Sequence, residues 1–213
     1  NVRDIFQQGF NWQNNIAFSG GTDKNTFRFS YGYLKNTGVL NNNVLNRHNF
    51  SLNTSSKVNN YLTVNASANY SNNFSKRTQQ GNQLSNPLFR GWITPRSYNL
   101  SGLAFEDAIG NQRYPLGEDN PYWTIKHVRF NDEINRFIGN VSFNFKLTKW
   151  LQADYKIGTD VYSTFRHAYD QIGARGGANT GANAIGGIRE VRNQYRSLGS
   201  NGYFTANKRF NDF

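Results

Sequence analysis

RFIGNVSFNFK (residues 136–146) and LQADYKIGTDV (residues 151–161) alternate between apolar and polar side chains and decide the fold of this chain. A β-strand sends successive side chains to opposite faces, so each run predicts a strand with one apolar and one polar face. The apolar face carries Phe137, Val141, Phe143, Phe145, Leu151, Ala153, Tyr155, Ile157 and Val161. The polar face carries Arg136, Asn140, Asn144, Lys146, Gln152, Asp154, Lys156 and Asp160.

This pair of strands has the proportions of a membrane hairpin. Both runs are roughly twice as long as the usual strand of a globular protein, which has about 5–6 residues. A tight polar break at 147–150 joins them, and long polar segments lead away from their far ends. Long alternating strands, short turns and long loops are typical of outer-membrane barrels.

Five further stretches predict strands, at residues 14–19, 26–37, 47–57, 61–72 and 195–208. In the second of these, Phe27, Phe29, Tyr31 and Tyr33 share one face. An aromatic stripe with a period of two is typical of a lipid-facing strand whose outer rings lie at the membrane interface. In a soluble β-sandwich the same stripe would be core.

The connections between these strands alternate in length. Short connections lie at 20–25, 58–60, 147–150 and 209–213, and long ones lie at 38–46, 73–133 and 166–192. Since antiparallel neighbours place alternate connections at opposite ends, all short turns meet at one rim and all long loops at the other. The sequence therefore predicts an all-β fold, an antiparallel transmembrane β-barrel with Thr148 in the periplasm and Arg166 onward outside. Ten residues are predicted to face lipid: Phe27, Phe29, Tyr31, Tyr33, Phe137, Val141, Phe143, Phe145, Tyr155 and Ile157.

Seven strands cannot close a barrel by themselves. Bacterial single-chain barrels use an even number of strands, eight or more, because an open edge in lipid leaves backbone groups without partners. The 213 residues are therefore expected to be part of a larger barrel or the ordered part of a longer protein.

Composition agrees with this interpretation. The mean hydropathy is −0.74 and no run approaches the roughly 18 apolar residues of a membrane helix, but a barrel strand shows lipid only every second residue. The net charge is +11, yet the basic residues are scattered, with the nearest approach to a cluster at Arg189, Arg192 and Arg196. A nucleic-acid partner is not expected; a solvated surface, or a basic barrel that faces anionic lipopolysaccharide, is preferred.

No catalytic constellation, cofactor site or metal site is predicted. The chain has no cysteine, and His48, His127 and His167 lie far apart without metal-ligand spacing. Calcium in the extracellular loops is considered at Asp119-Asn120 and Asp132-Glu133, although neither matches an EF-hand loop. The glycine-rich stretch 173–187 lacks the lysine of a phosphate-binding loop.

Aromatic residues of the long 73–133 segment are the candidates for contact with a ligand or a lid. They are Trp92, Tyr98, Tyr114, Tyr122 and Trp123. An aromatic ring combines apolar area with a polar edge, which suits sugar faces and peptide side chains. The competing interpretation, which is favoured, is that these rings pack the loop onto itself or onto a lid partner.

Four passages, taken together in order and spacing, resemble the SusC-like (RagA-like) TonB-dependent transporters of the Bacteroidetes outer membrane. They are residues 15–21 running into 27–33, residues 37–40 followed by 47–53, the motif Asp119-Asn120-Pro121-Tyr122, and residues 136–140 through 158–160. The passages span almost the whole chain.

The resemblance implies that residues 1–213 form the N-terminal part of a barrel of 22 strands. A plug domain, a segment that contacts the TonB complex and the remaining strands would lie outside this sequence. It also implies import of oligosaccharides or peptides together with a SusD-like surface lipoprotein, and no enzymatic activity.

Two alternatives stay open. One is a SusC-like barrel that serves as a structural subunit of an outer-membrane assembly or secretion complex. The other is a soluble carbohydrate-binding β-sandwich.

Overall fold

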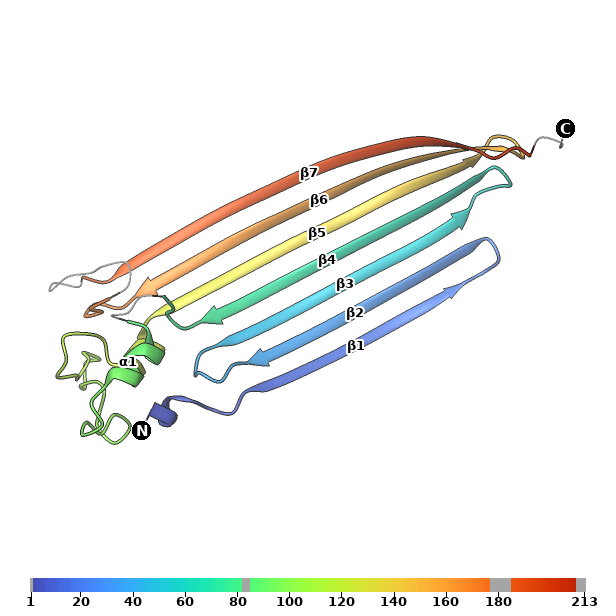
Figure 1. Ribbon diagram of the computed structural model, residues 1–213. Helices are drawn as coiled ribbons and strands as arrows, with labels where there is room; N and C mark the ends of the chain where they lie inside the picture. The colour runs from blue at the N-terminus through green and yellow to red at the C-terminus, as the bar shows by residue number, and fades with distance from the viewer. Residues whose placement is uncertain (1, 82–84, 177–184, 210–213) are drawn as a thin grey trace.

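The computed structural model describes residues 2–81, 85–176 and 185–209. Its main feature is one antiparallel sheet of seven strands that lie side by side in chain order (Figure 1). The strands are β1 (Phe10–Gly21), β2 (Asn25–Thr37), β3 (Val44–Lys57), β4 (Leu62–Arg77), β5 (Arg129–Lys146), β6 (Leu151–Asp170) and β7 (Gly187–Ala206). The predicted all-β antiparallel fold is confirmed.

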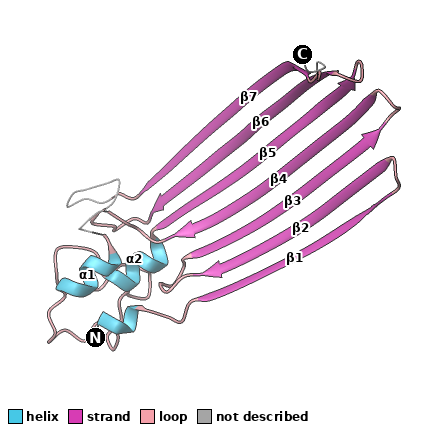
Figure 2. Cartoon of the chain, turned by 45° about the vertical axis from the view of Figure 1, so that its right-hand side comes forward, coloured by secondary structure: helices cyan, strands magenta, loops and turns pink. Residues whose placement is uncertain are grey.

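Short and long connections are segregated to opposite ends of the sheet. The tight turns at 22–24, 58–61 and 147–150 lie at the end near the C-terminus (Figure 1). The connections that follow β2, β4 and β6 lie at the other end, together with η1 (Val2–Ile5), α1 (Pro87–Ile93) and α2 (Pro121–His127) (Figure 2). The alternation of connection lengths therefore has the spatial consequence predicted from the sequence.

Several strands extend further toward the long-loop end than the sequence pattern predicted. β4 continues to Arg77, β5 begins at Arg129, and β7 begins at Gly187 instead of residue 195. The segment 73–133, which was predicted to lack regular structure, thus contains two strand ends and two helices. The alternation of apolar and polar residues does not reveal the strand here, because both faces of the sheet are polar. The hydrogen bonds between the strand backbones continue, since they do not depend on apolar side chains. The predicted turn at 210–212 lies outside the described residues.

The strand register places the ten residues predicted to face lipid on one face of the sheet. Tyr31 pairs with Phe50, Phe50 with Tyr70, Tyr70 with Phe137, and Phe137 with Val161. Because side chains alternate with a period of two, every second residue along each strand shares that face. We call it the apolar face, and we call the opposite face, which carries Arg136 and Asn140, the polar face.

The sheet has no second layer against its apolar face in the described part of the chain. Phe18, Leu198 and Phe204 are 63%, 73% and 75% exposed, respectively. The buried hydrophobic residues described come from the loops, η1 and α2 instead: Ile5, Leu40, Leu100, Tyr114, Trp123, Ile125, Val128 and Ala174. The loop end of the molecule thus has its own small core.

Neither α1 nor α2 could cross a membrane, and the described residues include no helix long and apolar enough to do so.

Candidate functional site

The loop end of the sheet is a compact cap built around two short helices that begin in the same way. We use the name loop cap for residues 2–9, 38–43, 85–128 and 171–176. Asn86 and Asn120 each precede a proline and accept hydrogen bonds from the backbone N–H groups of the first helical turn. Proline at the first helical position fixes φ without losing a needed donor, so an Asn-Pro pair starts a helix efficiently.

A buried carboxylate, Asp119, holds the loop cap together. Its Oδ2 atom accepts hydrogen bonds from Ser85 Oγ (2.5 Å) and from the backbone N–H of Gly176 (3.1 Å). Its Oδ1 atom accepts from Gln112 Nε2 (2.7 Å) and from the backbone N–H of Arg175 (2.8 Å). Asp119 is fully buried, and four donors offset the cost of removing its charge from water.

Further hydrogen bonds join the same two loops. The guanidinium of Arg175 donates to the carbonyl oxygens of Tyr114, Leu116 and Glu118. The Gln112 amide donates to the carbonyl of Gly173 at 2.7 Å. Because Gly173 and Arg175 follow β6, whereas Gln112 follows β4, these contacts fix the two long connections to each other.

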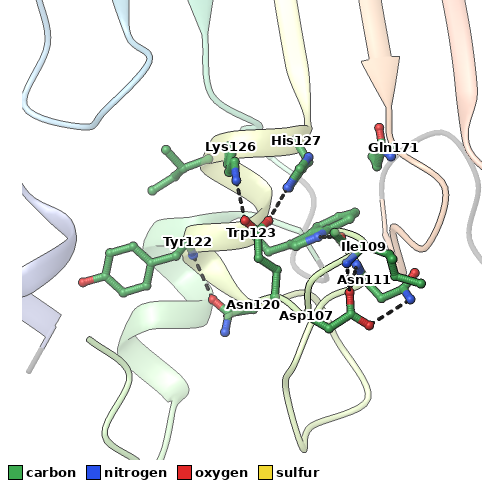
Figure 3. A network of polar contacts seen from close by, with 12 residues as sticks. Asp107, Ile109, Asn111, Asn120, Tyr122, Trp123, Lys126, His127 and Gln171 are labelled. Carbon is green, nitrogen blue, oxygen red and sulfur yellow. Dashed lines mark hydrogen bonds and ion pairs between the residues drawn. The ribbon is translucent and has the colours of Figure 1, made fainter. Parts of the chain in front are cut away.

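Trp123 is the centre of the small core of the loop cap (Figure 3). It is fully buried beside Val128 and Ala174, and its indole N–H donates to the carbonyl of Gly110 at 2.9 Å. The ring of His127 lies against it, with centroids 5.0 Å apart. The satisfied indole and complete burial are those of a packing residue.

A carboxylate clamp on α2 lies next to this core (Figure 3). Glu106 forms an ion pair with Lys126 and a hydrogen bond with His127, whose Nε2 atom lies 2.6 Å from Glu106 Oε2. The hydrogen bonds from Lys126 and His127 hold the pKa of the Glu106 carboxyl below its usual value. The clamp ties the loop around residue 106 to the last turn of α2.

The five aromatic residues proposed as ligand or lid contacts do not form one surface. Trp123 is fully buried, and Tyr114 is 7% exposed with its hydroxyl 2.5 Å from Thr94 Oγ1. Burial raises the pKa of Tyr114. Neither ring offers a face to a ligand in this conformation, because both pack the loop cap onto itself.

The other three aromatics keep accessible area. Tyr122 is partly buried and stacks on Phe105, with centroids 6.0 Å apart. Tyr98 packs edge-on against Tyr114 and lines a hollow of about 500 Å³ with Arg3 and Arg96. Trp92 is 75% exposed. Contact with a ligand or lid stays a prediction for Trp92, Tyr98 and Tyr122.

The polar face carries several hydrogen bonds and an ion pair between neighbouring strands. The pairs are Arg136 with Asp160 (2.9 and 2.6 Å), Asn140 with Ser67 (2.5 Å), and Asn144 with Asp154. Arg136, Asn140, Asp154, Lys156 and Asp160 were predicted to share the polar face of their strands, and the register places them on one face as a hydrophilic wall of mixed charge. Such a wall suits contact with water rather than with lipid.

One group on this wall was missed by the sequence analysis. Asp132 lies between the guanidinium groups of Arg77 and Arg166 on the polar face. Arg77 and Asp132 fell within the segment predicted to be a loop, so their shared face was not recognised. Continuing the two-residue period of β4 past Asn72 would have found Asn73, Ser75 and Arg77 on the same face.

The carboxylates considered as calcium ligands already have partners within the protein. Asp119 accepts four hydrogen bonds, and Asp132 contacts two arginines. Among the described residues, no group of three or more His, Asp or Glu side chains is placed to hold a metal ion.

Among the known proteins to which this chain is similar, a curated protein and a solved structure match almost its whole length. It is 26% identical over 213 residues to the TonB-dependent receptor P39 of Formosa agariphila, an alignment that covers 99% of this chain and 19% of that protein. It superposes on the structure of the RagAB peptide importer in the "closed-closed" state with a TM-score of 0.78 and 19% identity, over 99% of this chain and 24% of that one. No family model matches the chain.

These matches confirm the class of fold and the resemblance predicted from the sequence. The chain has the fold of an antiparallel segment of a transmembrane β-barrel. It is similar to SusC/RagA-like TonB-dependent transporters, and it spans about a fifth of the curated relative and about a quarter of the solved chain. The relatives are named as a receptor and an importer, in agreement with the expectation of a protein that is not an enzyme.

Proposed function

We propose that this chain forms part of the wall of a SusC-like TonB-dependent transporter in the outer membrane, within a larger barrel of 22 strands. The observation that carries the proposal is the segregation of the connections, with tight turns at one end of the sheet and the loop cap at the other. Outer-membrane barrels place short turns in the periplasm and long loops outside the cell. The similarity to a TonB-dependent receptor supports the same assignment.

The height of the apolar face supports a membrane location. Its apolar rows run from the level of Leu62 and Phe145 to the level of Tyr70 and Phe137. The eight residue-to-residue steps from Leu62 to Tyr70 at about 3.4 Å each give about 27 Å, and a strand tilt of about 40° reduces this to about 21 Å. That height is close to the apolar band of outer-membrane barrels, which is about 25 Å tall.

Tyrosines mark the upper limit of this band. The hydroxyl of Tyr31 lies 2.9 Å from His48 Nδ1, and the hydroxyl of Tyr70 donates to Asn135 Oδ1 at 2.7 Å. His48 and Asn135 belong to the next row of the same face, where Asn72 and Ser163 also lie. Each tyrosine thus places its ring on apolar neighbours and its hydroxyl in a polar row, as in an interfacial girdle.

We infer that the cargo is an oligosaccharide or a peptide, captured with a SusD-like surface lipoprotein. The resemblance to SusC-like transporters supports both points, and the RagAB importer, which shares the fold, is named as a peptide importer. The exposed Trp92 gives the loop cap a surface where such a lipoprotein could bind. Energy would come from the TonB complex through parts of the protein outside this chain.

Deletion of the gene in its native bacterium tests the function. We expect the deletion strain to lose uptake of a defined class of fluorescent oligosaccharide or peptide, and plasmid-borne wild type to restore it. Collapse of the proton gradient should abolish the restored uptake, and a lipoprotein should co-purify with the barrel. Normal uptake of all cargo combined with defective assembly or secretion of other outer-membrane proteins would instead support a structural subunit.

A further inference from the structure

A hollow of about 410 Å³ lies on the polar face near its loop end. Arg47, Asn73, Arg77 and Asp132 line it. They belong to neighbouring rows of the sheet: Arg47 pairs with Asn73, and Asp132 pairs with Ser75 on one side and with Arg166 on the other. Four strands, β3 to β6, and their regular register therefore fix the positions of these side chains.

The charges in this hollow do not balance. The buried Asp132 contacts Arg77 through Oδ2 and Arg166 Nε through Oδ1, the latter at 3.1 Å. Arg47 instead donates from Nε to the neutral Asn73 Oδ1 at 2.6 Å. Asp132 is the one acidic residue among those described as lining the hollow. Two arginines, Arg47 and Arg77, thus line the hollow with a single carboxylate, and Arg166 contacts that same carboxylate from β6 without lining the hollow.

The three arginines are both oriented and accessible. Each is held by one or more hydrogen bonds, while the side chains of Arg77 and Arg166 remain 48% and 59% exposed and Arg47 is also exposed. A guanidinium group has five N–H donors in a rigid fork, so one bond to the protein leaves donors for a carboxylate or sulfate. Asn49 and Ser71 add neutral polar groups to the same hollow, which suit hydroxyl or amide groups next to the charge.

We propose that this hollow binds carboxylate or sulfate groups of the cargo, so that the transporter prefers an anionic oligosaccharide or an acidic peptide. The inference rests on the proposed function, which makes the polar face the wall of the lumen. The position near the loop cap places the arginines at the outer end of that lumen, where incoming cargo would meet them first. An acidic side chain of another part of the same protein offers the same chemistry, and the experiment below separates the two.

The test uses the complete transporter, purified in detergent, and titration calorimetry with three ligands of equal length. These are a uronate oligosaccharide, an acidic peptide, and a neutral oligosaccharide. Arg47→Gln is the primary variant, because it removes a charge and leaves both contacts of Asp132 intact. We expect it to weaken binding of at least one anionic ligand roughly tenfold and to leave the neutral ligand unchanged. Arg47→Lys should restore part of the affinity, since it keeps the charge but not the fork.

Lys35→Gln is the matched control. Lys35 pairs with Asn46, one residue from Arg47, but its side chain lies on the apolar face. The control therefore removes one positive charge at nearly the same height but outside the lumen. We expect it to leave all affinities unchanged. Heat-modifiable migration on gels verifies that every variant is folded.

Three outcomes would overturn the inference. If the affinities for neutral and anionic ligands fall equally, the substitution disturbs the binding surface in general. If the affinity for anionic ligands is unchanged, the arginines stabilise the barrel wall and do not bind cargo. The variant could instead let another domain of the protein dissociate from the barrel at a lower denaturant concentration, without a change in anion selectivity. That result would show that the hollow contacts this domain and does not bind cargo. Uptake of neutral cargo alone contradicts this inference and leaves the proposed transport function standing, whereas absence of all uptake contradicts the function itself.

Discussion

Ser85 donates a buried hydrogen bond of 2.5 Å to Asp119, and these two residues occupy the same position before the two Asn-Pro helix starts. The bond places the N-terminal ends of α1 and α2 side by side. Since Asp119 also accepts from the backbone of residues 175 and 176, the alignment of the helices and the attachment of the second long connection depend on one carboxylate.

Asp119→Ala should therefore loosen the loop cap. The change leaves buried donors on Ser85 and Gly176 and partly buried donors on Gln112 and Arg175 without this acceptor, and we expect the free energy of local opening to fall by about 3–4 kcal/mol. Hydrogen exchange of α1 and α2 in the complete protein measures it. Asp107→Ala, which removes the cap of an exposed turn, is the control and should leave exchange in α1 unchanged. Equal protection in both variants would contradict a central role for Asp119.

Replacing Trp123 and Trp92 separately should distinguish packing from ligand contact. Trp123→Ala empties the core of the loop cap and is expected to cost about 3–5 kcal/mol of local stability. Trp92→Ala at its exposed site should change stability by less than about 0.5 kcal/mol. Limited proteolysis of the long connection measures the first effect, and binding of cargo or of the lipoprotein measures any effect of the second. Resistance of Trp123→Ala to proteolysis would contradict the packing role.

The assignment of the two faces of the sheet can be tested by introducing charge at mid-height. Val141 lies in the middle row of the apolar band, and Val141→Arg should cost roughly 2–4 kcal/mol of folding free energy in a bilayer. The control is Asn69→Arg, on the polar face between Ser51 and Ile138, where no like charge is opposite. It should fold with a change below about 1 kcal/mol. Urea titration of the barrel in lipid vesicles gives both values, and the reverse order would show that the faces are interchanged.

The Glu106 clamp should give the loop cap a pH-dependent contact. A carboxyl group with a lowered pKa stabilises the folded state at pH above its usual value, which is 4.5 for this group, and loses that contribution as the pH falls through the lowered pKa. We therefore expect the environment of Trp123 to change as the pH is lowered below about 4.5 and to be constant above it. The difference in fluorescence between wild type and Trp123→Phe reports this change. Glu106→Gln should abolish the transition; its persistence there would assign it to another group.

The sheet could be predicted because two signals agreed along most of the chain. Within the apolar band, alternation in β2, β5 and β6 identifies both the strand and its two faces, since one face must be apolar and the other need not be. The lengths of the connections then predict which end of the sheet faces the periplasm and which end lies outside the cell. Strand ends such as Arg77 and Gly187 were not predicted, because the alternation of apolar and polar residues disappears where both faces of the sheet meet water, while the backbone hydrogen bonds continue.

The loop cap was largely beyond sequence analysis because its contacts join residues far apart in the chain. The motif Asp119-Asn120-Pro121-Tyr122 was recognised as part of a family resemblance, but nothing in it reveals that Asp119 reaches the backbone of Arg175. The aromatic residues showed that the segment could bind or pack, and composition alone cannot distinguish these. Trp123 and Tyr114 are buried among neighbours that come from segments that no local pattern connects.

The hydrogen bonds of the loop cap make one rim of this sheet mechanically stiff. Asp119 and Arg175 join the connections after β4 and β6, and Asn42, after β2, donates to the carbonyl of Ile125 in α2 at 2.6 Å. Strands β2 to β7 are thus clasped at their outer ends, while at the opposite rim each hairpin closes on its own tight turn. A force that pulls on one long connection is shared by six strands. We therefore expect any widening of this end of the sheet to occur outside strands β2 to β7.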